Sequence, residues 1–341
     1  MNIPPCSIAK IRFFSQGKYG IRSRMSSTIS IQDDATICLL GPTAAGKTAF
    51  ALEIAKRLPV EIISVDSAMV YRGMDIGTGK PDSVELALVP HHLIDIRDPR
   101  EAYSAAQFAE DALSCIQDIR ARGAIPLLVG GTLLYFRALL EGLSPLPAAD
   151  ASIRSRLSEE GETSGWQALY ERLQRVDPAS AIRVHAHDKQ RIQRALEVYE
   201  ISGAPMSSFF KSAEKNSLSG ILAEYPIQMI GLMPKERREL HQKIEARFHE
   251  MLEKGLVAEV EKLFHRADLN AAMPSMRSVG YRQVWGYLAG EYGYDEMVAK
   301  AIAATRQLAK RQISWLKSLN EVQWVEGDIK TQAAHFDHSP F

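Results

Sequence analysis

A glycine-rich segment limits the folds open to this chain. It is Gly41-Pro42-Thr43-Ala44-Ala45-Gly46-Lys47-Thr48, with the spacing G-x-x-x-x-G-K-[ST]. The short apolar run 35–40 before it indicates a buried strand, and 49–58 after it has the pattern of an amphipathic helix. Strand, glycine loop and helix in this order identify a phosphate-binding loop. The sequence therefore predicts an α/β fold with a P-loop NTPase-like parallel sheet as its core.

The residue types of this loop suit a polyphosphate. Gly41 and Gly46 let the backbone wrap closely around the anion, so that successive N–H groups and the helix N-terminus point toward it. Lys47 adds a positive charge at the outer phosphate, and Thr48 offers its hydroxyl to Mg²⁺. All positions from 41 to 48 are thus candidate diphosphate-binding residues. The loop indicates a diphosphate or triphosphate without identifying it as ATP.

Composition sets wide bounds. With 341 residues the chain suits one large domain or two of ordinary size. Its formal net charge is zero, so nucleic-acid binding must depend on local basic patches. Cys6, Cys38 and Cys115 have neither metal-ligand nor disulfide spacing; we expect Cys38 and Cys115 to be buried thiols in a reducing compartment. No apolar run is long enough to span a membrane, and we expect a cytoplasmic protein.

Residues 1–34 differ from the rest of the chain. They are basic and rich in serine, and no acidic residue precedes Asp33. This composition resembles an organelle transit peptide. We favour a disordered extension, or a true start at Met25.

Hydrophobic periodicity outlines the remaining elements. It predicts strands at 60–65, 124–129 and 225–232, and a short strand at 91–95. It predicts helices at 104–123, 135–141, 238–266, 281–290 and 294–319. From 150 to 220 only helices are expected, so we predict an inserted all-helical domain at 147–220. The α/β core then comprises 35–146 and 221–325, with a weakly patterned tail at 326–341.

Asp66 follows the strand predicted at 60–65. Ligands of open α/β sheets bind outside the carboxyl ends of the strands, so Asp66 is expected beside the phosphate loop. The strand at 124–129 ends in Gly130-Gly131-Thr132, without the carboxylate that holds Mg²⁺ in ordinary P-loop NTPases, which weighs against ATP hydrolysis. Asp66 could bind Mg²⁺ through water or accept a proton from a nucleophile. The alternative is a helix N-cap.

Thr132 is expected at the mouth of the same crevice. Its hydroxyl could contact a leaving oxygen or an incoming base, or it could cap the helix that follows. His91 and His92 have no clear acidic or metal-binding partner in the sequence, and we interpret both as structural.

Two basic stretches stand out from the neutral background. The first contains Arg183, His185, His187, Lys189, Arg191 and Arg194. The second, 297–320, lacks acidic residues and places Arg306, Lys310, Ser314 and Lys317 on one helix face. Such a basic face suits a sugar–phosphate backbone, although a solvated surface is the alternative.

Five segments carry a resemblance to a known family. They are 41–48, 66–81, 91–95, 130–135 and 277–283, with the sequences GPTAAGKT, DSAMVYRGMDIGTGKP, HHLID, GGTLLY and RSVGYRQ. Together they resemble the tRNA dimethylallyltransferase family, also called tRNA isopentenyltransferases, over about 36–324. Ala45 stands where serine is commoner in the family. The sequence lacks the C-terminal zinc-finger set typical of eukaryotic cytosolic relatives, so the resemblance is to the bacterial type.

The resemblance implies transfer of the dimethylallyl group of dimethylallyl diphosphate to N6 of the adenosine 3′ of the anticodon. It implies Mg²⁺ as cofactor, the tRNA anticodon stem-loop as partner, no membrane partner and a monomer. Asp66 would be the base, Thr43 and Thr132 would contact the diphosphate or the target base, Arg237 would stabilise the leaving diphosphate, and Thr48 would serve the metal. The implied tRNA contacts are Asp66, Ser67, Ala68, Met69, Thr132, Arg154, Gln190, Arg191, Ile192, Gln193, Arg194, Arg277, Ser278, Val279, Gly280, Tyr281, Arg282, Thr305, Arg306, Lys310, Arg311 and Gln312.

Two other classes share part of this pattern. A P-loop kinase for a nucleotide or small metabolite has the phosphate loop and a helical insertion. The kinase function does not explain the segment 277–282 or the basic helix. A nucleic-acid binding module with a regulatory nucleotide leaves Asp66 unexplained.

Overall fold

The computed structural model describes residues 10–12, 28–30, 35–213, 225–319 and 321–326. Most of the predicted extension at 1–34, the tail at 327–341 and the end of the predicted insertion at 214–220 lie outside these ranges. Within the extension, β1 (Lys10–Arg12) and β2 (Thr28–Ser30) pair as antiparallel strands.

The chain forms two compact units, each of which is described by itself. We call Met1–Phe136 with Ala223–Phe341 the core unit, and Arg137–Leu222 the helical unit. The predicted insertion at 147–220 falls inside the helical unit, whose limits lie a little further out on both sides.

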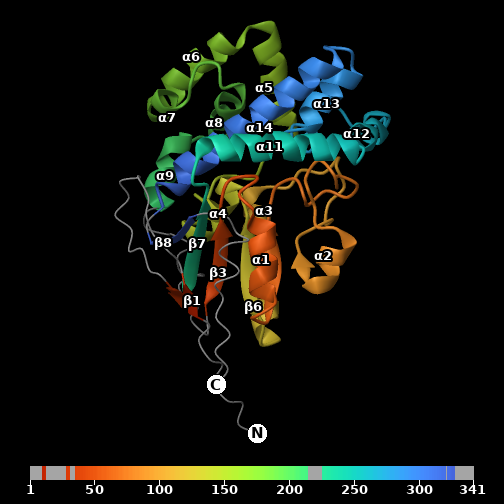
Figure 1. Ribbon diagram of the computed structural model, residues 1–341. Coiled ribbons are helices and arrows are strands. Elements are labelled where there is room, and N and C mark those ends of the chain that lie inside the picture. The colour runs from red at the N-terminus through yellow and green to blue at the C-terminus, as the bar shows by residue number, and fades with distance from the viewer. Residues whose placement is uncertain (1–9, 13–27, 31–34, 214–224, 320, 327–341) are drawn as a thin grey trace. The chain divides into compact units, whose positions relative to one another are not determined.

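A six-stranded sheet forms the centre of the core unit, in the order β5-β4-β6-β3-β7-β8 (Figure 1). The strands are β3 (Thr36–Leu40), β4 (Val60–Val65), β5 (His91–His92), β6 (Ile125–Gly130), β7 (Ile227–Met233) and β8 (Val322–Glu326). Every neighbouring pair is parallel. The carboxyl ends of the strands therefore meet at one edge, where such sheets bind ligands. The predicted α/β class is confirmed.

Helices surround this sheet. They are α1 (Lys47–Ala55), α2 (Ser83–Leu88), α3 (Ala105–Ala121), α11 (Arg237–Glu253), α12 (Leu256–Phe264), α13 (Tyr281–Leu288) and α14 (Tyr294–Leu316), while α4 (Leu133–Leu140) crosses into the helical unit. Helix α1 packs on β3, β4 and β6, and α3 packs on β4 and β6. Phe50 and Ile54 are one helical turn apart, so both face the sheet and join Ile37 and Leu39 in its core.

Two predictions about the core unit are wrong. The periodicity at 238–266 predicts one helix, but Gly255 adopts φ 97° and the chain divides into α11 and α12. The apolar period continues across this break, which is why the sequence pattern hides it. The weakly patterned tail is predicted to begin at 326, yet Glu326 ends strand β8, which pairs with β7 at the edge of the sheet. A short edge strand carries few residues with which to show alternation.

The thiols differ from one another in burial. Cys38 lies buried in β3 as predicted, whereas Cys115 in α3 is only half-buried, so the prediction for it is wrong. Cys6 lies outside the described residues.

The helical unit contains α5 (Ala151–Thr163), α6 (Trp166–Val176), α7 (Pro178–Arg183), α8 (Lys189–Ser202) and α9 (Met206–Ala213). Their apolar faces meet around Leu157, Leu173 and Ile192. Asp177 caps α7, and Gly203 ends α8 with φ 69°.

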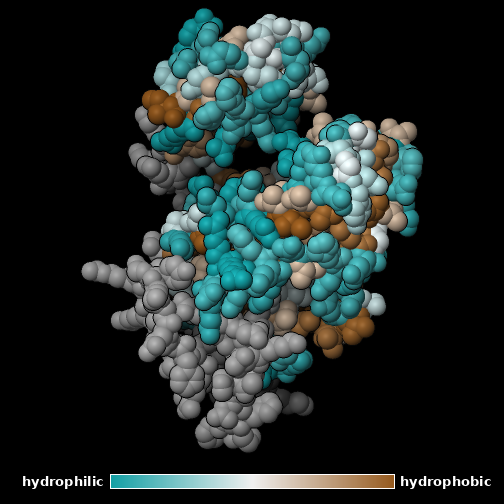
Figure 2. Space-filling model, turned by 45° about the horizontal axis from the view of Figure 1, so that its top comes forward, coloured by the Kyte–Doolittle hydropathy of each residue, from teal (hydrophilic) through white to brown (hydrophobic). Residues whose placement is uncertain are grey.

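The face in Figure 2 is largely hydrophilic, with apolar side chains in a few separate areas. Among the large apolar side chains that are exposed, Val84, Leu86 and Leu88 lie on α2. Of the helices in the described ranges, none combines the length and apolar composition needed to cross a bilayer.

Candidate active site

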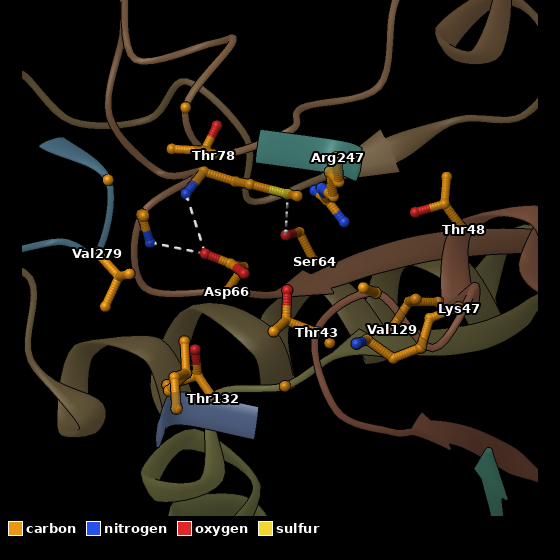
Figure 3. Close-up of a pocket in the computed structure, with 18 of the residues that line it drawn as sticks. Thr43, Lys47, Thr48, Ser64, Asp66, Thr78, Val129, Thr132, Arg247 and Val279 are labelled. Atoms are coloured by element: carbon orange, nitrogen blue, oxygen red, sulfur yellow. Dashed lines mark hydrogen bonds between the residues drawn. The ribbon is translucent and has the colours of Figure 1, made fainter. Parts of the chain in front are cut away.

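A cavity of about 780 Å³ opens at the carboxyl edge of the sheet, entirely within the core unit. The phosphate loop, the segments after β4 and β6, helix α11, the segment 277–281 and helix α14 all contribute to its lining. Figure 3 shows Asp66 and Thr132 together in this cavity, with Thr43 between them and the Lys47–Thr48 pair. Asp66 and Thr132 lie beside the phosphate loop, as expected from the sequence.

The phosphate loop has the backbone conformation that anion binding needs. Ala44 and Gly46 adopt positive φ values of 61° and 84°, and α1 begins at Lys47 without a side-chain cap. The N–H groups of the first turn of a helix have no partner within the helix. With no capping side chain, they are available to an anion, which the helix dipole also favours.

Lys47 lies in a strongly desolvated position. Its Nζ donates hydrogen bonds to the carbonyl oxygens of Gly41 at 2.9 Å and Pro42 at 2.8 Å. The pKa of Lys47 is lowered from 10.5 to about 8, chiefly by burial and also by the nearby charge of Arg247, while the charge of Asp66 acts in the opposite direction. A bound anion would restore the favourable environment of the ammonium group.

Arg247 of α11 faces the same cavity. Burial lowers its pKa, and the charges of Asp66 and Glu250 partly offset this effect. Its guanidinium makes no hydrogen bond or ion pair with any residue that the structure describes. A buried guanidinium strongly favours an anionic partner with planar or tetrahedral oxygens.

Asp66 has one oxygen engaged and one directed to the cavity side. Its Oδ1 accepts hydrogen bonds from the N–H groups of Ala68 at 2.8 Å and Met69 at 3.3 Å (Figure 3). The residues after Asp66 form turns rather than a helix, so Asp66 caps a turn. Within the described chain no hydrogen bond reaches Oδ2. The carboxylate can therefore hold the turn and still accept a proton.

Thr132 joins two strand ends. Its Oγ1 accepts a hydrogen bond from the N–H of Ser67 at 3.1 Å and lies 3.4 Å from the Ser67 hydroxyl. The side chain thus links the segment after β6 to the segment after β4.

Gln312 of α14 joins the phosphate loop to the segment after β6. Its Oε1 accepts from the N–H of Thr43, and its Nε2 donates to the carbonyl oxygen of Gly131, both at 2.8 Å. The side chain is only 5% exposed. Because both the oxygen and the nitrogen of the amide are hydrogen-bonded, Gln312 fixes the phosphate loop relative to the segment after β6.

Comparison with known proteins decides the family. The family model described as IPP transferase matches residues 69–319. The chain belongs to the IPP transferase family. The phosphate loop, 41–48, precedes the matched range, so its assignment depends on its own sequence and backbone geometry.

Solved structures agree with the family. A tRNA isopentenylpyrophosphate transferase of Bacillus halodurans is 35% identical, with 88% of this chain and 93% of the relative covered and a TM-score of 0.62. A tRNA isopentenylpyrophosphate transferase of Staphylococcus epidermidis is 33% identical, covers 88% and 96%, and has a TM-score of 0.61. A eukaryotic dimethylallyltransferase acting on tRNA shares the fold, with a TM-score of 0.71 at 24% identity over 88% of this chain and 75% of that one. The family resemblance inferred from the sequence is confirmed, and so is the expectation of a transferase enzyme.

The cavity of this IPP transferase gathers many of the residues that the resemblance implies. They are Thr43, Ala44, Gly46, Lys47, Thr48, Asp66, Ser67, Ala68, Met69, Thr132, Arg277, Ser278, Val279, Gly280, Tyr281, Thr305 and Gln312. Tyr281 is fully buried and donates its hydroxyl to Glu259, so its position is structural as well.

Other implied tRNA contacts lie outside the cavity of this IPP transferase, on α13 and α14. Arg306 forms an ion pair with Glu245 at 2.7 Å. Lys310 and Arg311 are exposed on the same helix, and Arg282 is exposed on α13. The basic face of α14 is therefore accessible at Lys310, while Arg306 is already engaged.

Several of the implied contacts in the helical unit are already engaged by other residues of that unit. Glu197 is fully buried and accepts hydrogen bonds from Arg154 at 2.8 Å and Arg194 at 2.7 Å. Ile192 is buried in the core of the unit, so its side chain offers no contact surface. Arg191 is exposed beside Asp188. Gln193 donates to the carbonyl oxygen of Arg154, and Gln190 is exposed.

Arg237 is not among the residues that line the cavity. It is the exposed first residue of α11, and its Nε lies 3.4 Å from the Nε2 of His241. The structure instead brings Lys243 and Arg247 to the cavity from the same helix. Sequence reasoning missed both. The available signal was their spacing, because positions 243 and 247 are one turn apart and flank the buried Ile244 and Phe248.

The prediction that the histidines lack an acidic partner is wrong for one of them. The Nε2 of His92 lies 2.7 Å from Glu61, which Arg122 also contacts. His91 lines the cavity, and its Nδ1 lies 2.8 Å from the carbonyl oxygen of Val89. Burial lowers the pKa of His91, so it is neutral at physiological pH.

Proposed function

We propose that this chain transfers the dimethylallyl group of dimethylallyl diphosphate to N6 of the adenosine immediately 3′ of the anticodon in tRNA. The C1–O bond of the allylic substrate breaks, the C1–N6 bond forms, N6 loses a proton and diphosphate leaves. The observation that carries the proposal is the meeting of the phosphate loop and Asp66 in one cavity, without a carboxylate at the end of β6.

The leaving diphosphate is the first chemical requirement. Negative charge develops on the bridging oxygen as the allylic C–O bond weakens. Donors that are already fixed in place stabilise such charge most effectively. The first-turn N–H groups of α1, the ammonium of Lys47 and the guanidinium of Arg247 surround the position proposed for the diphosphate.

Nucleophile activation is the second requirement. The lone pair of an exocyclic adenine amine is delocalised into the ring, so the neutral amine attacks poorly. Asp66 would accept a hydrogen bond from the N6 amine and take its proton as the C–N bond forms. Its second oxygen remains on the turn formed by Ala68 and Met69, which holds the carboxylate in place.

Access of the target base is the third requirement. An adenine stacked in an anticodon loop must be extruded to reach a cavity. The volume of about 780 Å³ accommodates a flipped base together with a prenyl chain and a diphosphate. The segments 66–69 and 277–281 line this cavity and are proposed to contact the extruded nucleotide.

Mg²⁺ is the proposed cofactor. This ion usually keeps several waters and is bound through one or two protein oxygens together with substrate phosphates. Within the described ranges no three His, Cys, Asp or Glu side chains gather as a metal cluster, whereas Thr48 and Asp66 line the diphosphate cavity. This donor set suits Mg²⁺ shared with the substrate: Thr48 would hold it directly and Asp66 through water. The bound ion would supply positive charge for the leaving diphosphate.

The tRNA anticodon stem-loop and dimethylallyl diphosphate are the proposed partners, and a monomer in the cytoplasm is the proposed state. A single mass corresponding to one chain in light scattering would agree with this state, and a dimer mass would contradict it.

One incubation tests the proposed reaction. The enzyme, Mg²⁺ and unmodified tRNA are combined with labelled dimethylallyl diphosphate or with γ-labelled ATP. Label is expected in tRNA from the isoprenoid alone, and the product nucleoside should be N6-substituted. Label that moves from ATP while the isoprenoid stays inert would favour a kinase instead. No transfer from either donor would favour a binding module.

A further inference from the structure

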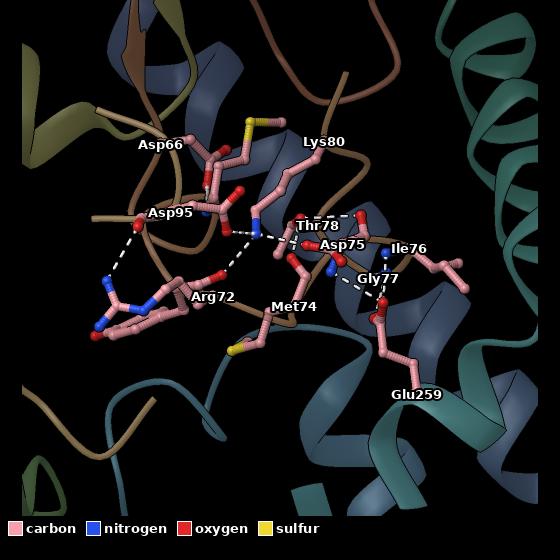
Figure 4. A network of polar contacts seen from close by, with 12 residues as sticks. Asp66, Arg72, Met74, Asp75, Ile76, Gly77, Thr78, Lys80, Asp95 and Glu259 are labelled. Atoms are coloured by element: carbon pink, nitrogen blue, oxygen red, sulfur yellow. Dashed lines mark hydrogen bonds and ion pairs between the residues drawn. The ribbon is translucent and has the colours of Figure 1, made fainter. Parts of the chain in front are cut away.

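Glu259 of α12 holds a loop that forms part of the cavity wall. Its carboxylate accepts hydrogen bonds from the backbone N–H groups of Asp75 at 2.9 Å, Ile76 at 2.8 Å and Gly77 at 3.1 Å (Figure 4). The hydroxyl of Tyr281 donates a fourth hydrogen bond to the same carboxylate. Three consecutive N–H groups that converge on one carboxylate fix the backbone of this loop much more firmly than a single contact would.

The far end of the loop is fixed separately. The ammonium of Lys80 donates to the carbonyl oxygen of Tyr71 at 2.6 Å and to the carboxylates of Asp75 and Asp95. The Lys80 side chain is only 6% exposed, whereas the side chains of Asp75 and Asp95 are 58% and 48% exposed, so solvent reaches the carboxylate side of these ion pairs. The segment 75–80 is thus anchored at both ends, by Glu259 and by Lys80.

Between the two anchors the loop meets Arg247. A Cβ atom at Gly79 would lie 1.9 Å from Nη2 of Arg247, closer than any real contact allows. Gly79 also adopts a positive φ of 65°. The backbone of the loop therefore lies directly against the guanidinium, and the position of the loop determines where the guanidinium can lie.

We propose that Glu259 is a positioning residue for diphosphate binding, which it supports by holding the loop 75–80 against Arg247. Glu259 is not among the residues that line the cavity, so it acts through the loop and not by touching the substrate. The inference rests on the proposed function in one respect, the assignment of Arg247 to the diphosphate.

Glu259→Gln is the first test, with Glu261→Gln as its matched control. Glu261 lies on the same helix and is exposed, with only a 4.0 Å contact to His265. The amide of Glu259→Gln supplies one acceptor oxygen in place of two and no charge. We measure the Kd of inorganic diphosphate with Mg²⁺ by calorimetry, the KM of dimethylallyl diphosphate, and the Kd of tRNA.

Glu259→Gln should weaken diphosphate binding and raise the KM of the isoprenoid by about 10-fold, since small misplacements of binding groups are costly. Binding of tRNA should weaken less than diphosphate binding, because the loop lies directly against Arg247 and meets the segment 277–281 at the fully buried Tyr281. Glu261→Gln should match the wild type. A purely structural role would instead lower the melting temperature and leave both diphosphate constants unchanged in the folded protein.

A pair of glycine variants tests the same contact from the other side. Gly79→Ala places a methyl group against Arg247, whereas Gly73→Ala, with a similar positive φ of 75°, meets nothing within 4 Å. Both carry the same backbone strain, so their difference isolates the contact. We expect Gly79→Ala to weaken diphosphate binding about 10-fold more than Gly73→Ala. This pair decides the inference if Glu259→Gln does not fold.

The outcomes separate this inference from the proposed function. Equal diphosphate affinity in Glu259→Gln and Glu261→Gln, or in the two glycine variants, would overturn the positioning role. A wild-type enzyme that binds diphosphate but does not prenylate tRNA would overturn the proposed function alone. A wild type that binds no diphosphate would overturn the inference together with the assignment of Arg247.

Discussion

Gln312 and Thr43 are 269 positions apart in the chain, yet the N–H of Thr43 donates to Oε1 of Gln312 at 2.8 Å. The same amide donates to Gly131, so the end of α14 bridges the phosphate loop and the segment after β6. The basic helix is therefore part of the framework of the site as well as a candidate surface for tRNA.

Asp66 can be tested as the base without disturbing its turn. Asp66→Asn retains Oδ1 as an acceptor for Ala68 and Met69 but cannot take a proton at pH 7. We expect kcat to fall by roughly 10²–10⁴, the usual contribution of a general base, with the Kd of tRNA within a few-fold. Single-turnover transfer and filter binding measure the two quantities.

Asp66→Ala is the companion variant, because it removes the turn contacts as well. Turnover near the wild-type level in Asp66→Asn, with a loss only in Asp66→Ala, would make Asp66 a cap of the turn. A similar loss in both would support the base.

Arg247 and Arg237 can be separated by substitution. Arg247 lines the cavity, whereas Arg237, which the family resemblance implies, is exposed at the start of α11. Arg247→Ala should weaken diphosphate binding by roughly 10- to 100-fold, the value of a charge-assisted hydrogen bond in a desolvated site. Arg237→Ala should change it by less than about twofold, since exposed ion contacts contribute little. Calorimetry with inorganic diphosphate and Mg²⁺ measures both, and the reverse order would restore the assignment of Arg237.

The pKa of Lys47 gives a prediction for pH. It is about 8 in the free enzyme, and an anionic ligand favours the ammonium form, so the bound complex holds the proton more tightly. Affinity for diphosphate should therefore stay level below pH 8 and fall as the pH rises above it, by up to about tenfold per unit.

Lys47→Arg is the control for this titration, because its guanidinium stays charged over the same range. Protonation of the ligand affects the pH profile of the variant as it does that of the wild type, whereas deprotonation of Lys47 affects the wild type alone. Equal pH profiles for wild type and variant between pH 7 and 9.5 would refute the role given to Lys47.

Local motifs predict the parts of this site that are built from neighbouring residues. The spacing of Gly46, Lys47 and Thr48 specifies a loop whose conformation depends on its own backbone. The position of Asp66 was predictable because it comes directly after one predicted strand. Most strands were predictable because each is a short apolar run bounded by turns.

Contacts between distant segments could not be read from the sequence. The pair Glu61–His92 depends on which strands are neighbours, and the pairs Glu259–Gly77 and Arg247–Gly79 depend on which helix packs beside which loop. The division at Gly255 was hidden because the apolar period runs on across it. The resemblance supplied Gln312 as a tRNA contact, whereas the fold shows its amide engaged on both sides.

The basic face of α14 gives the last prediction. Lys310 is exposed and makes no ion pair within the described residues, whereas Arg306 pairs with Glu245 at 2.7 Å. A lysine that neutralises one phosphate of a single-stranded loop contributes about 0.7 to the slope of log Kd against log salt. Lys310→Ala should reduce the slope for tRNA by that amount, while Arg306→Ala should reduce it less because Glu245 already offsets its charge. Filter binding between about 50 and 200 mM salt measures both slopes. An unchanged slope in Lys310→Ala would make this helix face a solvated surface and leave tRNA binding to the cavity and to other parts of the chain.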